Sequence, residues 1–179
     1  VIGADKMSAI TDYQDRSTCV LFGDGAGGVL LERGEDLDYG LRDFELHSDG
    51  AGCDELYMKG GGSLNPATHE TVDQRLHYIR QEGRSVFKFA VTRMTEVSQS
   101  LLQRNGLSVE DLKLFVPHQA NMRIISATAQ RLGLPLEKVM VNIERYANTT
   151  AGTVPIALSE AHKQGRLERG DWLLLTGVG

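Results

Sequence analysis

Two polar loops in the second half of the sequence hold the side chains best suited to chemistry. One is 116–121 (VPHQAN), which contains His118, and the other is 146–153 (YANTTAGT), which contains Asn148. Imidazole and carboxamide N–H groups are neutral hydrogen-bond donors. Two such donors aimed at one oxygen, in a site that excludes water, can stabilise an oxyanion such as the enolate of a thioester. The two residues are far apart in the chain, so only the fold can bring them together.

Both residues also have a purely structural interpretation. A histidine that follows proline is often a hydrogen-bonded structural residue, and an Asn-Thr-Thr sequence is often a turn or a helix cap. Residue types alone therefore leave the choice open. We predict no metal site, because the sequence has no CxxC or HExxH motif and no histidine-rich cluster. The remaining histidines lie in segments typical of a surface and receive no chemical role: His47, His69, His77 and His162.

The elements that would position these loops follow from apolar periodicity. Three strands are expected at Leu112 to Val116, Val139 to Ile143 and Trp172 to Thr176. Three helices are expected from Val86 to the break at Asn105-Gly106, from Ile124 to Leu132, and from after Asn148 through Pro155 to near Gly165. This alternation predicts an α/β fold, a mainly parallel mixed sheet with helices on both faces. Such sheets bind ligands beyond the carboxyl ends of their strands, where both polar loops would lie.

The first part of the chain carries a glycine run, 23–28 (GDGAGG), between two β-rich stretches, 17–22 and 29–32. Its spacing matches GxGxxG, but a phosphate-binding loop of that type would open a helix. The run leads into a strand-like stretch instead, so we favour a tight turn between two strands. Residues 36–62 are rich in glycine and polar residues and are expected to form excursions over the surface.

Bulk composition indicates an ordinary globular protein of 179 residues, with 41% hydrophobic and 24% charged residues. A net charge of -5 argues against a nucleic-acid-binding surface over the whole protein. Cys19 and Cys53 form no disulfide framework, which favours the cytoplasm. No membrane span and no leader are expected from the sequence. Because it opens on Val1 without methionine and stops at Gly179 after a strand-like run, both ends are expected to be cut.

Four segments resemble the β-ketoacyl-ACP synthase III family of the thiolase superfamily. Residues 117–125 (PHQANMRII) resemble its PHQAN-x-RII segment, and 23–28 resemble its FGDGAGA turn. Residues 148–151 (NTTA) are similar to its NTSA segment, and 86–88 (VFK) are similar to the start of one of its helices. The four matches occur in the family's order along the whole chain. They imply the C-terminal half of such a protein together with the end of its N-terminal half.

The resemblance implies a thiolase-like fold, of which this chain would be about one half of the duplicated fold. Residues 1–35 would end the N-terminal half, 36–84 would form connecting excursions and a tunnel-lining segment, and 85–179 would be the C-terminal condensing-enzyme domain. The implied activity is an acyltransferase reaction, decarboxylative Claisen condensation of acyl-CoA with malonyl-ACP, which initiates type II fatty-acid synthesis. A cytoplasmic homodimer is implied, with acyl-CoA and acyl carrier protein as partners and without a cofactor, nucleic acid or membrane.

The resemblance also implies roles for residues. His118 and Asn148 would assist decarboxylation and hold the enolate oxygen. Carrier-protein binding is implied for Gln119, Ala120, Asn121, Met122, Arg123 and Lys88, and a CoA and pantetheine tunnel for Gly83, Phe87, Ala120 and Asn121. Because acyl carrier proteins are acidic, a basic cluster would steer them to the tunnel mouth, and Arg93 and Arg131 could join it. For these two arginines a solvated helix face is an equally good interpretation.

The family's nucleophilic cysteine belongs to the N-terminal half, and neither cysteine of this sequence stands in a matching context. Cys19 and Cys53 are therefore expected to be structural, and the chain alone is expected to be inactive. Two other functions remain open. One is a non-catalytic half-subunit or carrier-protein-binding module, and the other is a related thioester condensing enzyme with a different extender or a CoA-bound acceptor.

Overall fold

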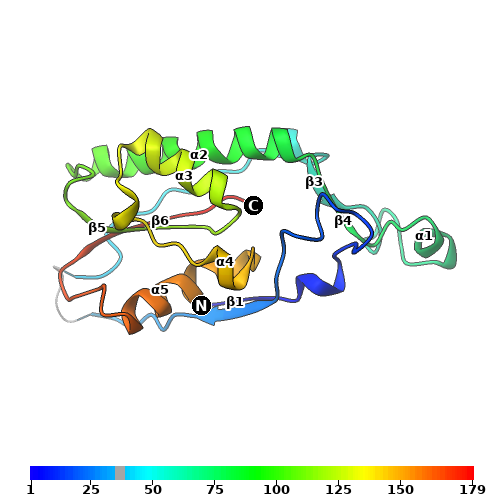
Figure 1. Ribbon diagram of the computed structural model, residues 1–179, viewed down its shortest axis with the longest axis horizontal. Coiled ribbons are helices and arrows are strands. Elements are labelled where there is room, and N and C mark those ends of the chain that lie inside the picture. Colours follow the sequence, from blue (N-terminus) through cyan, green and yellow to red (C-terminus); the bar gives the residue numbers. More distant parts are fainter. Residues whose placement is uncertain (35–38) are drawn as a thin grey trace.

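The computed structural model describes residues 1–34 and 39–179 (Figure 1). The predicted boundary between residues 35 and 36 lies outside the described residues. The strands are β1 (Ile2–Asp5), β2 (Gly25–Gly28), β3 (Leu56–Met58), β4 (Ile79–Gln81), β5 (Leu112–Pro117) and β6 (Trp172–Thr176). The α-helices are α1 (His69–Asp73), α2 (Gly83–Arg104), α3 (Met122–Leu132), α4 (Ile143–Tyr146) and α5 (Thr153–Lys163). Short 3-10 helices are η1 (Met7–Ala9), η2 (Gly50–Gly52), η3 (Leu136–Lys138) and η4 (Thr150–Gly152).

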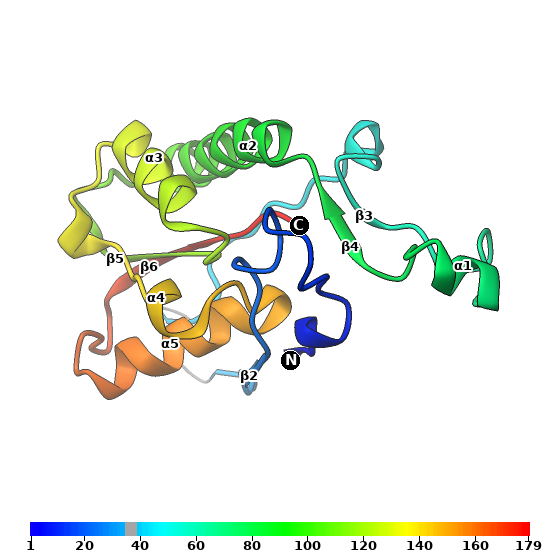
Figure 2. The same ribbon diagram turned by 45° about the vertical axis from the view of Figure 1, so that its right-hand side comes forward.

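A parallel pair of strands forms the middle layer of the body. β5 and β6 run side by side in parallel, and Val139 adds a parallel bridge to Phe115. α2 and α3 cover one face of this layer and α5 covers the other (Figures 1 and 2). Successive side chains of β5 point to opposite faces of the layer. Phe115 packs in the buried cluster that includes residues of α3, whereas Leu114 and Val116 pack in the cluster that includes residues of α5. Helices on both faces of a parallel layer are thus confirmed, although the other two strand pairs are antiparallel.

The two helices that border the candidate site form as the sequence predicts. α2 begins at Gly83, a little before the expected start, and ends where Gly106 adopts a left-handed φ of 66°. α3 begins after Asn121, whose side chain accepts a hydrogen bond from Ile124 N, and ends at Gly133 with a φ of 74°. The apolar faces of the two helices meet in a buried cluster of Ala90, Val91, Met94 and Ile124.

The prediction for the glycine run was wrong. Its second part forms strand β2, antiparallel to β1, while 17–21 form turns and 29–32 have no regular structure. The reason is a close approach of another segment. A Cβ on Gly25 would lie 2.7 Å from Thr149 Cγ2, and a Cβ on Gly27 would lie 3.0 Å from Ile156 N. Gly25 and Gly27 therefore leave one side of the strand without side chains, and the Asn148 loop and the start of α5 pack there.

The strand expected at Val139 to Ile143 was also largely wrong. Only the bridge at Val139 forms, supported by a hydrogen bond from Met140 N to Phe115 O of 2.8 Å. Two residues later the N–H of Asn142 donates to a side chain, Gln119 Oε1, at 3.0 Å. That bond takes the chain out of the sheet, and α4 begins at the next residue.

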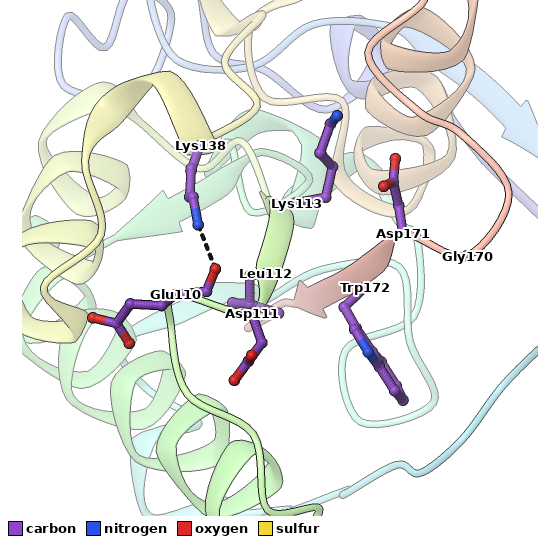
Figure 3. Close-up of a pocket in the computed structure, with 8 residues that line it drawn as sticks. All are labelled: Glu110, Asp111, Leu112, Lys113, Lys138, Gly170, Asp171 and Trp172. Carbon is purple, nitrogen blue, oxygen red and sulfur yellow. Dashed lines mark hydrogen bonds between the residues drawn. The ribbon is translucent and has the colours of Figure 1, made fainter.

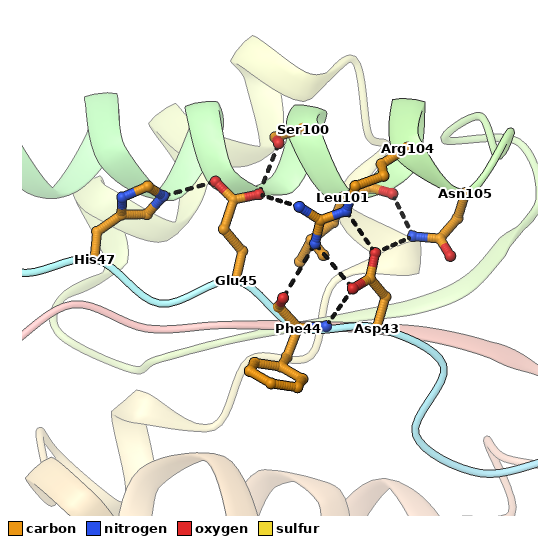
Figure 4. Close-up of polar contacts among 8 residues, drawn as sticks. All are labelled: Asp43, Phe44, Glu45, His47, Ser100, Leu101, Arg104 and Asn105. Carbon is orange, nitrogen blue, oxygen red and sulfur yellow. Dashed lines mark hydrogen bonds and ion pairs between the residues drawn. The ribbon is translucent and has the colours of Figure 1, made fainter.

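The segment 41–49 lies along the C-terminal part of α2 and is attached by alternate side chains (Figure 4). Arg104 donates to both carboxylate oxygens of Asp43, at 2.7 and 2.9 Å, and Ser100 donates to Glu45 at 2.7 Å. The bonds to Arg104 and Asn105 lower the pKa of Asp43 to about 2. Phe44 projects away from α2 and is exposed. The expected excursion over the surface is therefore held to α2 by polar contacts.

A second excursion projects from the body and carries β3, α1 and β4 (Figures 1 and 2). β3 and β4 pair antiparallel, and Ile79 N donates to Ile10 O at 2.9 Å. Buried Asp12 binds Arg75 of the excursion at 2.5 Å, with Arg80 also in ion-pair range. Among the described residues, no helix is both long and apolar enough for a membrane span.

Candidate active site

His118 is the first residue after β5. Its backbone N–H donates to Thr176 O at 2.7 Å, so the link to β6 continues one residue beyond the strand. Gly177 lies beside it, because a Cβ on that glycine would be 3.6 Å from His118 Cβ. In the described part of the chain neither ring nitrogen of His118 has a hydrogen-bond partner. The backbone of His118 is fixed, while its ring nitrogens have no partner among the described residues.

Burial determines the charge of this imidazole. Desolvation lowers the pKa of His118 from 6.5 to about 4. The ring is therefore neutral at pH 7 and keeps one N–H donor and one lone pair. A neutral donor can strengthen its hydrogen bond to an oxygen on which negative charge develops, without first bringing a full positive charge into the site.

Asn148 is fixed by backbone bonds to the N-terminal part of the chain. Its N–H donates to Leu21 O at 2.9 Å, and its carbonyl accepts from Gly23 N at 3.0 Å. The side chain is 9% exposed, and Oδ1 accepts from Thr150 N at 2.9 Å. For Nδ2 the described residues provide no hydrogen-bond partner. The oxygen end of the carboxamide is thus occupied, and the donor end is free.

The His118 loop and the chain that leads to Asn148 leave the parallel layer at the same edge. β5, β6 and the Val139 bridge all run in one direction, so their carboxyl ends share an edge. Gln119 ties the His118 loop to residues 140–142: its Nε2 donates to Pro117 O at 2.9 Å and Met140 O at 3.0 Å, and its Oε1 accepts from Asn142 N. No hydrogen bond joins His118 to Asn148 directly within the described residues. Their common feature is an N–H donor without a partner among the described residues.

Gln119 connects segments of the backbone, and its predicted contact with a carrier protein stays a prediction. Its side chain is only 1% exposed, and the three bonds above occupy its carboxamide. Its contribution is to hold the backbone on either side of His118 against the chain that leads to Asn148.

Replacing Gln119 by leucine is expected to lower the free energy of unfolding by about 2–4 kcal/mol. Leucine has a similar size, but it leaves Asn142 N and two carbonyls buried without partners. Urea unfolding would measure the loss. The matched control is Gln130→Leu, on the exposed face of α3, which should change stability little. Equal stability of the two variants would contradict the connecting role of Gln119.

The residues expected to line a tunnel are brought together only in part. Phe87 of α2 and Ala120 both pack against the buried cluster between α2 and α3. Asn121 uses its side-chain oxygen to cap α3 at Ile124 N, 3.0 Å away. Gly83 is exposed, and a Cβ there would meet open space. The apolar pair Phe87 and Ala120 therefore borders the His118 loop, whereas Gly83 makes no such contact.

The basic residues of this region separate into two groups. Lys88 and Arg123 are exposed, and neither forms an ion pair with any described residue. The Arg123 guanidinium lies 5.2 Å from the centre of the Phe87 ring, which places both at the junction of α2 and α3. Arg93 instead pairs with Glu96 at 2.8 Å, and Arg131 reaches Thr92 at 3.4 Å. Exposed Met122 lies next to Arg123 at the start of α3.

Asp5 is a site residue that sequence analysis missed. Its Oδ2 accepts from Thr150 Oγ1 at 2.5 Å and from Ala151 N at 2.9 Å. These donors belong to the second and third residues after Asn148. Local sequence gives no signal for this role, because Asp5 is a single acid at the end of a short strand. The left-handed φ of 47° at Thr150 is the structural sign that the loop needs support.

A shallow open hollow lies at the opposite edge of the parallel layer (Figure 3). It is formed by the amino ends of β5 and β6, around Leu112 and Trp172, and is bordered by Lys138, which donates to Glu110 O at 2.8 Å. Ligands of parallel sheets bind at the carboxyl ends of strands, so we do not assign chemistry to this hollow. Within the described ranges no group of three or more His, Cys, Asp or Glu residues could hold a metal ion.

Comparisons with known proteins agree on one family. A family model described as 3-oxoacyl-[acyl-carrier-protein] synthase III C terminal matches residues 102–179, and the model for 3-oxoacyl-[acyl-carrier-protein] synthase III matches residues 1–50. β-Ketoacyl-[acyl-carrier-protein] synthase III of Chlorobium luteolum is 59% identical over the whole chain, which covers 55% of that protein. The Koribacter versatilis protein of the same name is 54% identical, with 54% of it covered. The chain spans about half the length of these curated relatives.

Solved structures show the same similarity in three dimensions. 3-Oxoacyl-[acyl-carrier-protein] synthase III from Aquifex aeolicus matches the whole chain with a TM-score of 0.88 and 44% identity, and the chain covers 53% of it. The corresponding structure from Pseudomonas aeruginosa has a TM-score of 0.88 and 41% identity, with 99% of this chain and 53% of the other matched. The described fold is therefore about half of the fold of these proteins.

Proposed function

Because this chain belongs to the 3-oxoacyl-[acyl-carrier-protein] synthase III family, we propose that it supplies the enolate-stabilising donors of a condensing enzyme. The full-length protein would join the acyl group of acyl-CoA to malonyl-ACP and begin type II fatty-acid synthesis. The observation that supports this most is that the neutral ring of His118 and Nδ2 of Asn148 both have an N–H donor without a partner among the described residues.

The proposed reaction begins with transfer of an acyl group from CoA to a cysteine thiolate, which breaks the thioester of acyl-CoA and releases CoA as its thiolate. Malonyl-ACP then loses its free carboxylate as CO2, and the electron pair of that C–C bond moves into the thioester as an enolate. His118 and Asn148 donate hydrogen bonds to the enolate oxygen. The enolate carbon attacks the acyl carbonyl and expels the cysteine thiolate, which leaves 3-oxoacyl-ACP.

We propose that the cysteine nucleophile lies outside this chain. Cys19 sits within the 17–21 turns, where its N–H donates to Asp15 O at 2.9 Å, and exposed Cys53 ends η2 in a surface excursion. Neither follows a strand of the parallel layer, and the relatives are almost twice as long as the chain. The chain by itself should therefore not form an acyl-enzyme.

The test is a condensation assay with the full-length protein, acyl-CoA and malonyl-ACP, with the product identified by its mass. Formation of 3-oxoacyl-ACP is expected, and the chain alone should give none. Mixing the chain with the remaining part of the protein should restore activity that is lost again in His118→Ala. Turnover by the chain alone, with an acyl group found on Cys19 or Cys53, would overturn the assignment. A full-length protein that binds carrier protein without condensing would indicate a binding module.

The carrier-protein surface is proposed at the junction of α2 and α3. Lys88 and Arg123 provide positive charge without acidic partners among the described residues, and Met122 adds an exposed apolar contact beside them. Ala120 and Phe87 would continue inward along the pantetheine path toward His118. The carboxamide of Asn121 is used as a helix cap, so it would shape the entrance to this path at the start of α3. For Gly83, exposed at the start of α2, proximity to CoA remains a prediction.

Reversing the charge of Lys88 or Arg123 to glutamate is expected to raise the KM for malonyl-ACP about tenfold while kcat changes little. An acidic carrier protein would lose attraction to this surface, and the effect should shrink as salt is added. Steady-state kinetics at two ionic strengths would measure both features. The control is Lys163→Glu on α5, across the parallel layer (Figure 1). A KM increase as large in the control would contradict a local docking surface.

The division into 1–35, 36–84 and 85–179 is supported by β1–β2 in the first part and by the parallel layer with its helices in the last. A homodimer and a cytoplasmic location are proposed for the full-length protein, the latter supported by two free cysteines. The proposed reaction uses two thioester substrates and needs no cofactor.

A further inference from the structure

We infer that Asp5 is a positioning residue that fixes the carboxamide of Asn148 by holding Thr150 in a left-handed backbone conformation. This inference rests on the proposed function, because the direction of the Asn148 amide matters only if Nδ2 acts on a ligand. Asp5 does not touch that ligand in the proposal. It acts from β1, through the loop that follows Asn148.

The contacts form a short continuous chain. Asp5 Oδ2 accepts from Thr150 Oγ1 at 2.5 Å and from Ala151 N at 2.9 Å. Thr150 N in turn donates to Asn148 Oδ1 at 2.9 Å. One carboxylate oxygen thus binds two successive residues, and the first of them sets the orientation of the Asn148 side chain. With Oδ1 occupied, Nδ2 must point to the other side of the carboxamide.

Thr150 needs this support because of its backbone. Its φ is 47°, in the left-handed region, where a β-branched side chain is unfavourable. A threonine left to itself would relax toward negative φ and carry its N–H away from Asn148 Oδ1. The two bonds to Asp5 hold the hydroxyl and the next N–H in place, so the loop cannot relax while the carboxylate is present.

The carboxylate is well suited to this role at neutral pH. The hydrogen bonds from Thr150 and Ala151 lower the pKa of Asp5 below its usual value. The group is therefore ionised, and hydrogen bonds to an ionised acceptor are stronger than those to a neutral one. The antiparallel pairing of β1 with β2 places Asp5 opposite Gly25. The carboxylate of Asp5 is therefore held by a strand and not by a loop.

Three variants of the full-length protein test this inference: Asp5→Ala, Thr150→Gly and the double variant. Asp5→Ala is expected to lower the condensation rate about 10- to 100-fold, as misplacement of a catalytic group does, while acylation of the cysteine by acyl-CoA changes less than about twofold. Thr150→Gly should be nearly normal, because glycine adopts left-handed φ without strain. In the Thr150→Gly background, loss of Asp5 should cost much less than it does in the native background.

The pattern of rates decides between positioning and general support of the structure. An equal loss of both half-reactions in Asp5→Ala would overturn the inference. So would a loss from Asp5→Ala that is as large in the Thr150→Gly background as in the native background. Should Asp5→Ala fail to fold, Asp5→Asn keeps the size and one acceptor, and the same comparison applies with a smaller expected loss.

A second readout separates this inference from the proposed function. Selective 15N labelling would follow the side-chain amide signals of Asn148 without any substrate. These signals should shift in Asp5→Ala and return toward their original positions in the double variant, even if the protein condenses nothing. Unchanged signals in Asp5→Ala would overturn the positioning role, whereas absence of 3-oxoacyl-ACP in the native protein would overturn the proposed function alone.

Discussion

Replacing His118 by alanine in the full-length protein is expected to reduce condensation about 10²- to 10³-fold, the usual effect of removing one oxyanion donor. Acylation of the cysteine should remain measurable, because the proposed role of His118 begins only when malonyl-ACP decarboxylates. Separate assays of CO2 release and of acyl transfer from acyl-CoA would show this division. His162→Ala, an exposed histidine of α5, is the matched control and should leave both steps unchanged. A comparable loss of both steps in His118→Ala would contradict a donor role confined to the enolate.

The pH dependence of the same residue follows from its low pKa. With a pKa of about 4, His118 is neutral from about pH 5 upward, so its titration should not limit condensation between pH 5 and 8. In the unfolded chain the same imidazole titrates near pH 6.5. As the pH falls, the unfolded state therefore binds the proton before the folded state does. The contribution of neutral His118 to the free energy of unfolding is complete above pH 6.5 and is lost as the pH falls toward 4. A condensation rate that falls with a midpoint near 6.5 and follows His118 would contradict the neutral donor.

The parallel layer and its helices could be predicted because their signals are local. The buried run from Leu112 to Val116 faces helices on both sides, so every position in contact with them is apolar and reads as a buried strand. α2 and α3 repeat apolar residues at helical spacing and end at glycines with left-handed φ. In each case the residues that determine the element lie within it, and tertiary contacts add to a preference already present.

The errors occurred where a distant segment determines the local structure. The glycine run reads as a turn by composition, but its conformation is set by Thr149 and Ile156, which pack on it from the other end of the chain. The strand expected at Val139 to Ile143 stops early because Gln119 takes the N–H of Asn142. Both contacts depend on where the polar loops lie. Neither loop's position is visible in the local sequence.

The candidate site shows the same limit. His118 and Asn148 were found from side-chain chemistry and from their resemblance to family segments, each of which is a short local pattern. Asp5 was not found, because a single acidic residue at the end of a strand indicates no role until its hydrogen bond with Thr150 is known. The connecting role of Gln119 was also not found, since a sequence cannot show which polar atoms of a side chain are bonded within the chain. Residues that act through others are therefore the hardest to predict.

Replacing Gly3 by alanine is expected to damage both stability and condensation. A Cβ on Gly3 would lie 2.1 Å from Ala151 O and 2.6 Å from its carbonyl carbon, so the obstacle is backbone and cannot rotate away. β1 and η4 would have to separate, at a cost of about 3 kcal/mol in the free energy of unfolding. Asp5 lies on the same strand and Asn148 precedes η4, so condensation should also fall about 100-fold through misplacement of the donor.

The environments of other glycines make this prediction specific. Gly25→Ala meets Thr149 Cγ2 at 2.7 Å and Thr149 Cβ at 2.8 Å, overlaps that are less severe than the 2.1 Å approach at Gly3, so its effects should be smaller. Gly50→Ala meets nothing within 4 Å and is the control. Urea unfolding and the condensation assay should rank the damage as Gly3, then Gly25, then Gly50. If Gly3→Ala matched Gly50→Ala in both measurements, β1 would not be the surface that holds the Asn148 loop, and the role inferred for Asp5 would lose its structural basis.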